Sequence, residues 1–194
     1  MKRHLLFLAA LLIVNLAASA QKKFSVYAVG FYNQENLFDT CHDEGKKDYE
    51  YLPNKGWNGM KYTNKLRNMS KALADMGTDV LPNVGCAFIG LSEVENHKVL
   101  DALVDQAPLK ARNMKYVHIE GPDRRGIDCA LLYNPSLFSV KNVKLLPYVQ
   151  ELAKDSAFFT RGVLTVRGEM AGDDVGVIGC HRASRFSGAF SREA

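Results

Sequence analysis

The chain of 194 residues has no internal repeat, no low-complexity tract and no Cys-x-x-Cys pair. The absence of repeats and biased segments, together with 47% hydrophobic residues and scattered charges, indicates a globular protein. A zinc site is not expected, because the four cysteines lack metal-ligand spacing. Cys86, Cys129 and Cys180 lie in apolar runs that resemble strands, so we expect buried free thiols rather than disulfides.

Long apolar runs are also missing, except near the N-terminus. Residues 5–16 are apolar apart from Asn15, follow Lys2 and Arg3, and precede Ala-Ser-Ala at 18–20. This pattern predicts a signal peptide over residues 1–20, cleaved before Gln21, and a secreted or periplasmic product. No later segment is long and apolar enough to cross a bilayer. Removal of the leader leaves 23 basic and 21 acidic residues, and this balance neither requires nor excludes a nucleic-acid partner.

Residues 21–194 are enough for one domain with a hydrophobic core. Apolar side chains spaced by four and three positions predict an amphipathic helix over 61–76, and a shorter helix is expected at 97–105. Residues 39–59 are expected to form a long polar loop. The alternation of helices and strands predicts an α/β fold in which helices cover sheets. The expected strands are 24–32, 86–91, 115–119, 129–133, 138–146, 162–167 and 175–180.

The most informative motif is IGLSEVEN at residues 89–96. Its apolar run predicts a buried strand, and Glu93 stands at the end of that strand. A carboxylate on a rigid element at the border of a cleft is a common ligand for Mg²⁺. The alternative is a strand followed by a polar turn.

Other polar residues follow predicted strands in the same way. Asn33, in FYNQENLFD at 31–39, could orient a phosphate or a metal-bound water, and Glu35 could support the metal indirectly. The alternative for this segment is an Asx-type turn. His181 follows an apolar strand and could act as a general acid or base, although a lone histidine is more often structural.

Arginines supply candidate phosphate ligands, because the guanidinium group matches phosphate geometry. Arg125 lies beside Arg124 in a glycine-flanked loop, and Arg161 follows Phe-Phe-Thr at 158–160. Asp128, at the start of the strand after that loop, could orient a histidine. The alternative for the loop is a hairpin turn with solvated charges.

Four motifs in this order resemble the endonuclease/exonuclease/phosphatase superfamily, which has the fold of pancreatic-type deoxyribonuclease. The matches are FYNQENLFD, IGLSEVEN, RGIDCALLYNP at 125–135 and Thr-Arg at 160–161. A further family motif, NHWPSRxxG, is only partly kept as CHRASRFSG at 180–188. The resemblance implies a four-layered α/β sandwich of two similar halves. The GDxN and SDH motifs of the second half do not occur here, so we expect residues 21–194 to form a partial domain with much of that half missing.

The resemblance implies metal-assisted hydrolysis of a phosphodiester. Mg²⁺ is the expected cofactor, with Mn²⁺ and Ca²⁺ as alternatives, and His181 would be oriented by Asp128 for proton transfer. The residues implied are the metal ligands Glu93 and Glu35, the catalytic residues His181, Asp128 and Asn33, and the phosphate ligands Arg161, Arg185 and Arg125.

The function expected from this resemblance is that of a secreted endonuclease acting on nucleic acid, with DNA preferred to RNA as substrate. We infer no stable protein partner and expect a monomer. The alternatives are a sphingomyelinase-like or small-phosphoester hydrolase, and a non-catalytic remnant. Because the second-half motifs are missing, we expect little activity from this chain alone and exposed apolar strand faces, for example at Leu164, Val166 or Ile178.

Overall fold

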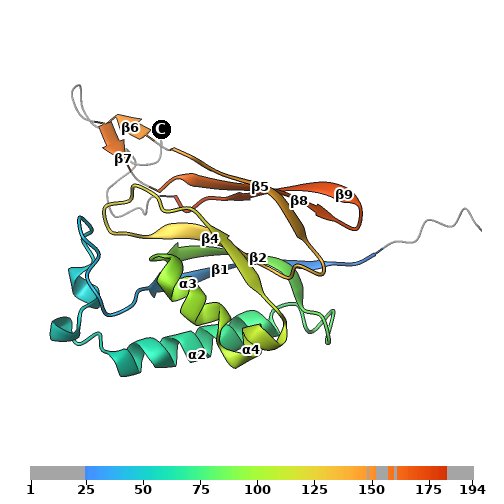
Figure 1. The fold of residues 1–194 in the computed structure, drawn as a ribbon, viewed down its shortest axis with the longest axis horizontal. Helices are drawn as coiled ribbons and strands as arrows, with labels where there is room; N and C mark the ends of the chain where they lie inside the picture. The colour runs from blue at the N-terminus through green and yellow to red at the C-terminus, as the bar shows by residue number, and fades with distance from the viewer. Residues whose placement is uncertain (1–24, 148, 152–156, 160, 183–194) are drawn as a thin grey trace, which may run out of the picture.

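The computed structural model describes residues 25–147, 149–151, 157–159 and 161–182. Figure 1 shows a layer of helices, a middle sheet and a second sheet stacked on one another. No helix of the described residues is long and apolar enough to cross a membrane. The elements are β1 Ala28–Leu37, the 3-10 helices η1 Tyr49–Tyr51 and η2 Pro53–Lys55, α2 Gly59–Asp75, β2 Cys86–Val94, α3 His97–Val104, α4 Ala107–Ala111, β3 Lys115–His118, β4 Asp128–Tyr133, β5 Ser139–Leu146, β6 Val149–Glu151, β7 Ala157–Phe159, β8 Val163–Met170 and β9 Asp173–Gly179.

The middle sheet has four strands in the order β1-β2-β4-β3. β1 and β2 are parallel, while β4 is antiparallel to both β2 and β3. A parallel pair needs a crossover connection, and α2 provides it between β1 and β2. The helices cover one face of this sheet, where Leu66, Leu100 and Leu132 belong to one buried cluster. β2 is therefore a rigid, central support for the residues at its C-terminal end.

The second sheet has the antiparallel order β5-β8-β9 and packs on the other face of the middle sheet. The two sheets meet through a cluster that includes Leu131, Phe138 and Leu164. The α/β class is confirmed, and the described residues supply the helix–sheet–sheet part of the expected four-layered sandwich.

Two helices begin at asparagine caps. The predicted helix at 61–76 is α2, which starts earlier because Asn58 Oδ1 accepts a hydrogen bond from Lys61 N–H at 3.1 Å. The predicted helix at 97–105 is α3, whose cap is Asn96, the last residue of IGLSEVEN. Asn96 Oδ1 accepts hydrogen bonds from Lys98 N–H at 2.9 Å and from Val99 N–H at 3.2 Å. The end of this motif therefore has a structural role.

Several local predictions are wrong. β1 extends to Leu37, beyond the predicted end at residue 32, because Leu37 still pairs with Val94 after a register shift. Most of FYNQENLFD therefore lies within the strand. The loop at 39–59 contains the two 3-10 helices, and the β6–β7 hairpin was not expected. Cys86 and Cys129 are buried free thiols as predicted, whereas Cys180 is exposed because it lies beyond the end of β9.

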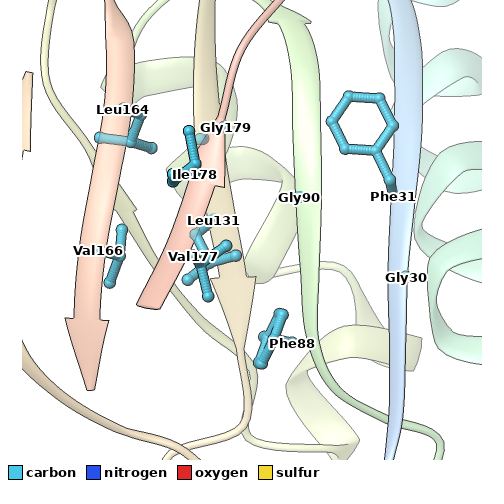
Figure 2. A pocket seen from close by; sticks show the side chains of 11 residues that line it. Gly30, Phe31, Phe88, Gly90, Leu131, Leu164, Val166, Val177, Ile178 and Gly179 are labelled. Carbon is cyan, nitrogen blue, oxygen red and sulfur yellow. The ribbon is translucent and has the colours of Figure 1, made fainter. Parts of the chain in front are cut away.

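An apolar pocket of about 190 Å³ lies between β9 and the β1–β2 side of the middle sheet (Figure 2). Phe31 on β1 is 54% exposed and Ile178 on β9 is 72% exposed. The expected exposure of apolar strand faces is thus found at Ile178, whereas Leu164 and Val166 are buried between the sheets.

Candidate active site

The candidate site is centred on Glu93 near the C-terminal end of β2. Glu93 Oε2 accepts a hydrogen bond from Asn36 N–H at 3.0 Å, so this carboxylate joins the ends of β1 and β2. The backbone φ angles of Glu35, Asn36 and Glu93 are 51°, 61° and 60°. Non-glycine residues in this left-handed region are strained, and such strain clusters at functional sites. The predicted metal ligand is therefore held in a costly, well-defined conformation.

His181 reaches Glu93 from the second sheet. His181 Nε2 lies 3.1 Å from Glu93 Oε1, and both side chains are partly buried. Burial lowers the pKa of His181, nearby Arg161 lowers it further, and the Glu93 carboxylate opposes this change. The lowered pKa favours the neutral imidazole, whose Nε2–H faces the Glu93 carboxylate and whose Nδ1 is able to accept a proton. The predicted base and the predicted metal ligand meet at the junction of the two sheets.

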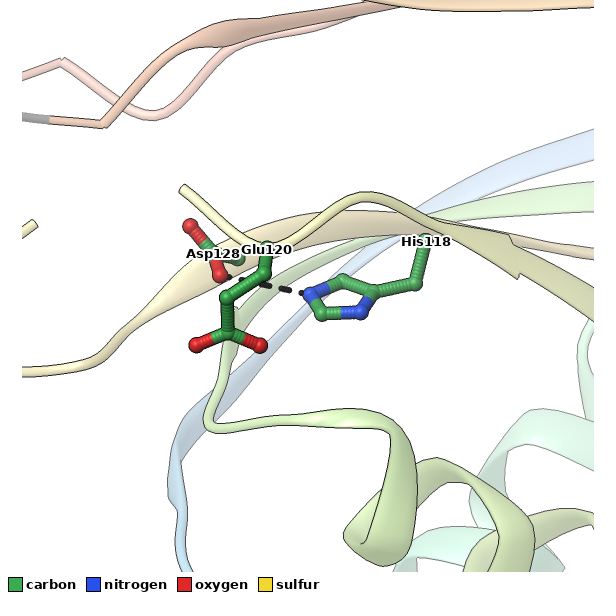
Figure 3. Close-up of side chains that lie close together, drawn as sticks. All are labelled: His118, Glu120 and Asp128. Atoms are coloured by element: carbon green, nitrogen blue, oxygen red, sulfur yellow. Dashed lines mark hydrogen bonds and ion pairs between the residues drawn. The ribbon is translucent and has the colours of Figure 1, made fainter. Parts of the chain in front are cut away.

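Asp128 contacts a different histidine from the one expected. Its Oδ2 lies 3.3 Å from His118 Nε2 (Figure 3). The same oxygen accepts a hydrogen bond from Gly121 N–H at 3.0 Å. A side chain at Gly121 would not fit, because its Cβ would lie 2.3 Å from Asp128 Oδ1. β3 and β4 are neighbouring strands, which brings His118 to Asp128, whereas His181 comes from the other sheet. The expected pairing of Asp128 with His181 is replaced by pairing with His118.

Asp123, which belongs to none of the predicted site residues, interacts with both Arg125 and Arg161. Asp123 Oδ1 accepts a hydrogen bond from Arg125 N–H at 2.9 Å, and Asp123 Oδ2 lies 3.6 Å from Arg161 Nε. Arg161 is only 9% exposed, and its Nε makes no hydrogen bond with the described residues. Burial lowers the pKa of Arg161, and Asp123 raises it. A buried guanidinium with an unused donor suits an anionic ligand. Arg185 lies outside the described residues.

Asn33 and Glu35 lie on β1, and Asn33 pairs in register with Ser92 of β2. Asn33 Oδ1 accepts a hydrogen bond from Glu35 N–H at 2.8 Å, which is the local turn given above as the alternative. Lys65 of α2 donates to the Glu35 carbonyl at 2.6 Å. Burial lowers the pKa of Lys65, whereas Glu35 and Glu93 raise it. Lys65 is thus a cation of this site that the sequence did not reveal.

The oxygen donors at the ends of β1 and β2 fit a hard divalent cation. Glu93 supplies a partly buried carboxylate, Glu35 an exposed one and Asn33 an amide oxygen. Mg²⁺ is commonly held by one or two carboxylates and several waters, which is the type of ligand that these residues offer. Glu93 would be the main ligand, with Asn33 and Glu35 beside it.

A second group of potential ligands is formed by His118, Glu120 and Asp128, whose donor atoms lie within 4.8 Å of one another (Figure 3). Lys46 Nζ lies 3.5 Å from Glu120 Oε1 and would repel a cation there. Asp128 Oδ2 already accepts a hydrogen bond from Gly121 N–H and faces His118. This group is better explained as the support of the 119–127 loop.

Comparisons with known proteins agree with this fold. The sequence profile of the Endonuclease/Exonuclease/phosphatase family matches residues 28–193. No curated protein matches the chain.

Three similar solved structures illustrate the likeness. ANGEL2, a 2′,3′-cyclic phosphatase, has a TM-score of 0.51 at 14% identity, covering 81% of this chain and 41% of its own. Beta toxin from Staphylococcus aureus, as a β-hairpin deletion mutant, has a TM-score of 0.47 at 13% identity, with 83% and 52% covered. TDP2 from D. rerio, complexed with single-strand DNA product, has a TM-score of 0.45 at 14% identity, with 66% and 43% covered. The chain thus spans about half or less of these proteins, and the likeness to ANGEL2 supports the fold alone.

Proposed function

Because this chain belongs to the endonuclease/exonuclease/phosphatase family, we propose that it carries the metal-binding part of a Mg²⁺-dependent phosphodiester hydrolase. The observation that carries the proposal is the 3.1 Å contact between Glu93 and His181, with the buried Arg161 close enough to lower the pKa of that histidine. A carboxylate and an imidazole are therefore in contact, and a guanidinium is near enough to act on the imidazole.

Each group has a role in such a reaction. Glu93 would hold the cation, which would polarise the phosphoryl oxygen and stabilise charge on the leaving oxygen. Arg161 and Arg125 would bind the phosphate and offset its negative charge. His181 Nε2–H faces the acceptor-only Glu93 carboxylate, so His181 would take or return a proton at Nδ1. Asp128 would act indirectly, by fixing the loop that carries Arg125.

The proposed substrate is nucleic acid, with DNA preferred to RNA, and the proposed setting is secreted or periplasmic. Arg125 and Arg161 support an anionic substrate, and Arg185 is proposed as a further phosphate ligand. We also propose a monomer without a stable protein partner.

The experiment compares the wild type with Glu93→Gln and with Glu120→Gln as the matched control. Both exchanges keep the side-chain shape and remove one charge, but only Glu93 belongs to the proposed metal site. We expect only weak Mg²⁺-dependent cleavage of plasmid DNA by the wild type, because the second-half motifs are missing. This cleavage should fall by about 100-fold or more in Glu93→Gln, because positioning and charge stabilisation supply much of the catalysis. Calorimetry should show weaker Mg²⁺ binding in this variant alone.

Substrate preference is tested with RNA, sphingomyelin and a chromogenic phosphodiester beside DNA, and with Mn²⁺ and Ca²⁺ beside Mg²⁺. Equal activity and equal Mg²⁺ affinity in Glu93→Gln and wild type would refute the proposed metal ligand. Faster turnover of sphingomyelin or the small phosphodiester would refute the nuclease assignment while keeping the hydrolase.

A further inference from the structure

A pocket next to the candidate site combines aromatic and cationic side chains. Its volume is about 660 Å³, and the segment containing η1 and η2 forms one wall while Arg125 lies on another. Lys47, Lys55 and Arg125 line it together with one acidic residue, Glu50. Cations therefore outnumber anions in the lining, which favours a negatively charged ligand. The size is that of a ligand site rather than of a packing defect.

The pocket adjoins the proposed catalytic residues. Asn36 lines it and also donates its N–H to Glu93 Oε2 at 3.0 Å. Tyr51 lines it too, and burial raises the pKa of Tyr51, with Glu50 and Glu93 adding to this rise and Arg125 opposing it. A ligand in the pocket would therefore lie beside Glu93, the proposed metal ligand.

The aromatic rings of the pocket are held in place. Tyr51 stacks on the buried Phe38, with ring centroids 4.1 Å apart and planes 3° apart. Tyr49 stacks on His42 at 4.8 Å and is 55% exposed, so much of its ring surface is available to another planar group. Exposed tyrosines on a cationic surface are typical of proteins that bind unpaired bases.

The loop that carries these rings is fixed before any ligand binds. Asp48 is 1% exposed, accepts a hydrogen bond from Asp43 N–H at 2.8 Å and pairs with His42 Nδ1. Lys47 N–H donates to the Arg124 carbonyl at 2.7 Å, which joins the two walls. A preorganised pocket loses little entropy on binding.

We propose that this pocket binds a nucleotide of single-stranded nucleic acid next to the phosphate that is cleaved. The base stacks on Tyr49, Lys47 and Lys55 contact the neighbouring phosphates, and Arg125 lies on the side of the cleaved phosphate. A lipid headgroup offers no planar ring for Tyr49, and a base inside a duplex is already stacked. The proposal rests on the proposed function, since it gives that site a substrate class.

The test measures binding separately from hydrolysis. A short fluorescein-labelled oligothymidylate is titrated with the full chain in EDTA, and the Kd is read from fluorescence anisotropy. Tyr49→Ala should raise the Kd by roughly 5- to 150-fold, which is the loss expected for one base–aromatic stack. Tyr49→Phe keeps the ring and should bind like wild type. Because Tyr49 is exposed, both variants should keep the circular dichroism spectrum of the wild type.

The cationic part is tested by salt dependence. Lys55→Gln should lower the slope of log Kd against log salt concentration by about 0.7, the value for one phosphate contact on a single strand. Lys144→Gln, which changes an exposed lysine on β5, is the matched control and should leave the slope unchanged.

Three results would overturn the proposal: equal Kd values for Tyr49→Ala and wild type, tighter binding of a duplex than of the single strand, or binding to phosphatidylglycerol vesicles without binding to the oligonucleotide. The expected losses of affinity without any Mg²⁺-dependent cleavage would support the pocket and refute the hydrolase. Cleavage that is insensitive to Tyr49→Ala, with unchanged Kd, would refute the pocket and keep the hydrolase.

Discussion

Replacing Asp128 should affect stability through His118 and not through His181. Asp128→Ala removes the buried carboxylate that accepts the Gly121 N–H hydrogen bond and faces His118 Nε2, and the Asp128 and His118 side chains are 3% and 4% exposed. Each buried donor left without a partner costs about 1–3 kcal/mol. We therefore expect the free energy of unfolding to fall by about 3–5 kcal/mol, as for a broken buried pair.

A double-mutant cycle separates the two histidines. The free energy of unfolding is measured by urea denaturation for Asp128→Ala, His118→Ala, His181→Ala and the two double variants, using the fluorescence of Trp57, the single tryptophan. The coupling energy between positions 128 and 118 should exceed about 1 kcal/mol, whereas positions 128 and 181 should be additive within about 0.5 kcal/mol.

The milder Asp128→Asn keeps an acceptor for Gly121 N–H and serves if the alanine variant does not fold. It should lose less stability than Asp128→Ala. A coupling energy that is larger with His181 than with His118 would refute the structural role of Asp128 and restore the pairing expected from the sequence.

Two substitutions and one titration test the packing, the capping and the site. Gly168→Ala would place a Cβ 2.3 Å from the buried Phe138 ring and should cost about 1–3 kcal/mol in urea denaturation, whereas at Gly176, the control, a Cβ meets no atom within 4 Å and should cost little. Asn58→Ala should cost about 1 kcal/mol, and Asn58→Ser should not, because serine also caps helices. An NMR titration should give His181 a pKa below 6.5. Folding favours the neutral form of His181. The resulting contribution to the free energy of unfolding is fully present above pH 6.5 and is lost as the pH falls through the lowered pKa. A His181 pKa at or above 6.5 would contradict the burial of this side chain.

Features set by local sequence were predictable. The apolar spacing of α2 depends only on helix geometry, and Glu93 ends an apolar run that is long enough for a buried strand. The family resemblance is confirmed by the profile match over residues 28–193. These predictions succeed because the pattern and the structure follow the same periodicity.

Features set by strand neighbours were not predictable. Whether Asp128 meets His118 or His181 depends on which strands lie side by side, and the sequence does not state that order. Asp123 interacts with Arg125 in its own loop and with Arg161, which lies far along the chain just before β8. One local clue was available, since Asp123 precedes two arginines in a glycine-flanked loop.

The division of the candidate site between two sheets determines which distant mutations can impair it. Glu93 belongs to the middle sheet, whereas Arg161 and His181 flank β8 and β9 of the second sheet. The distance between the two sheets, and so between these site residues, is set by buried side chains such as Phe138 and Leu164 that pack between them. A substitution there that shifts one sheet by about 1 Å could reduce turnover by about 100-fold even if the fold survives. During divergence, this interior layer is therefore expected to tolerate fewer changes in volume than its distance from the chemistry would suggest.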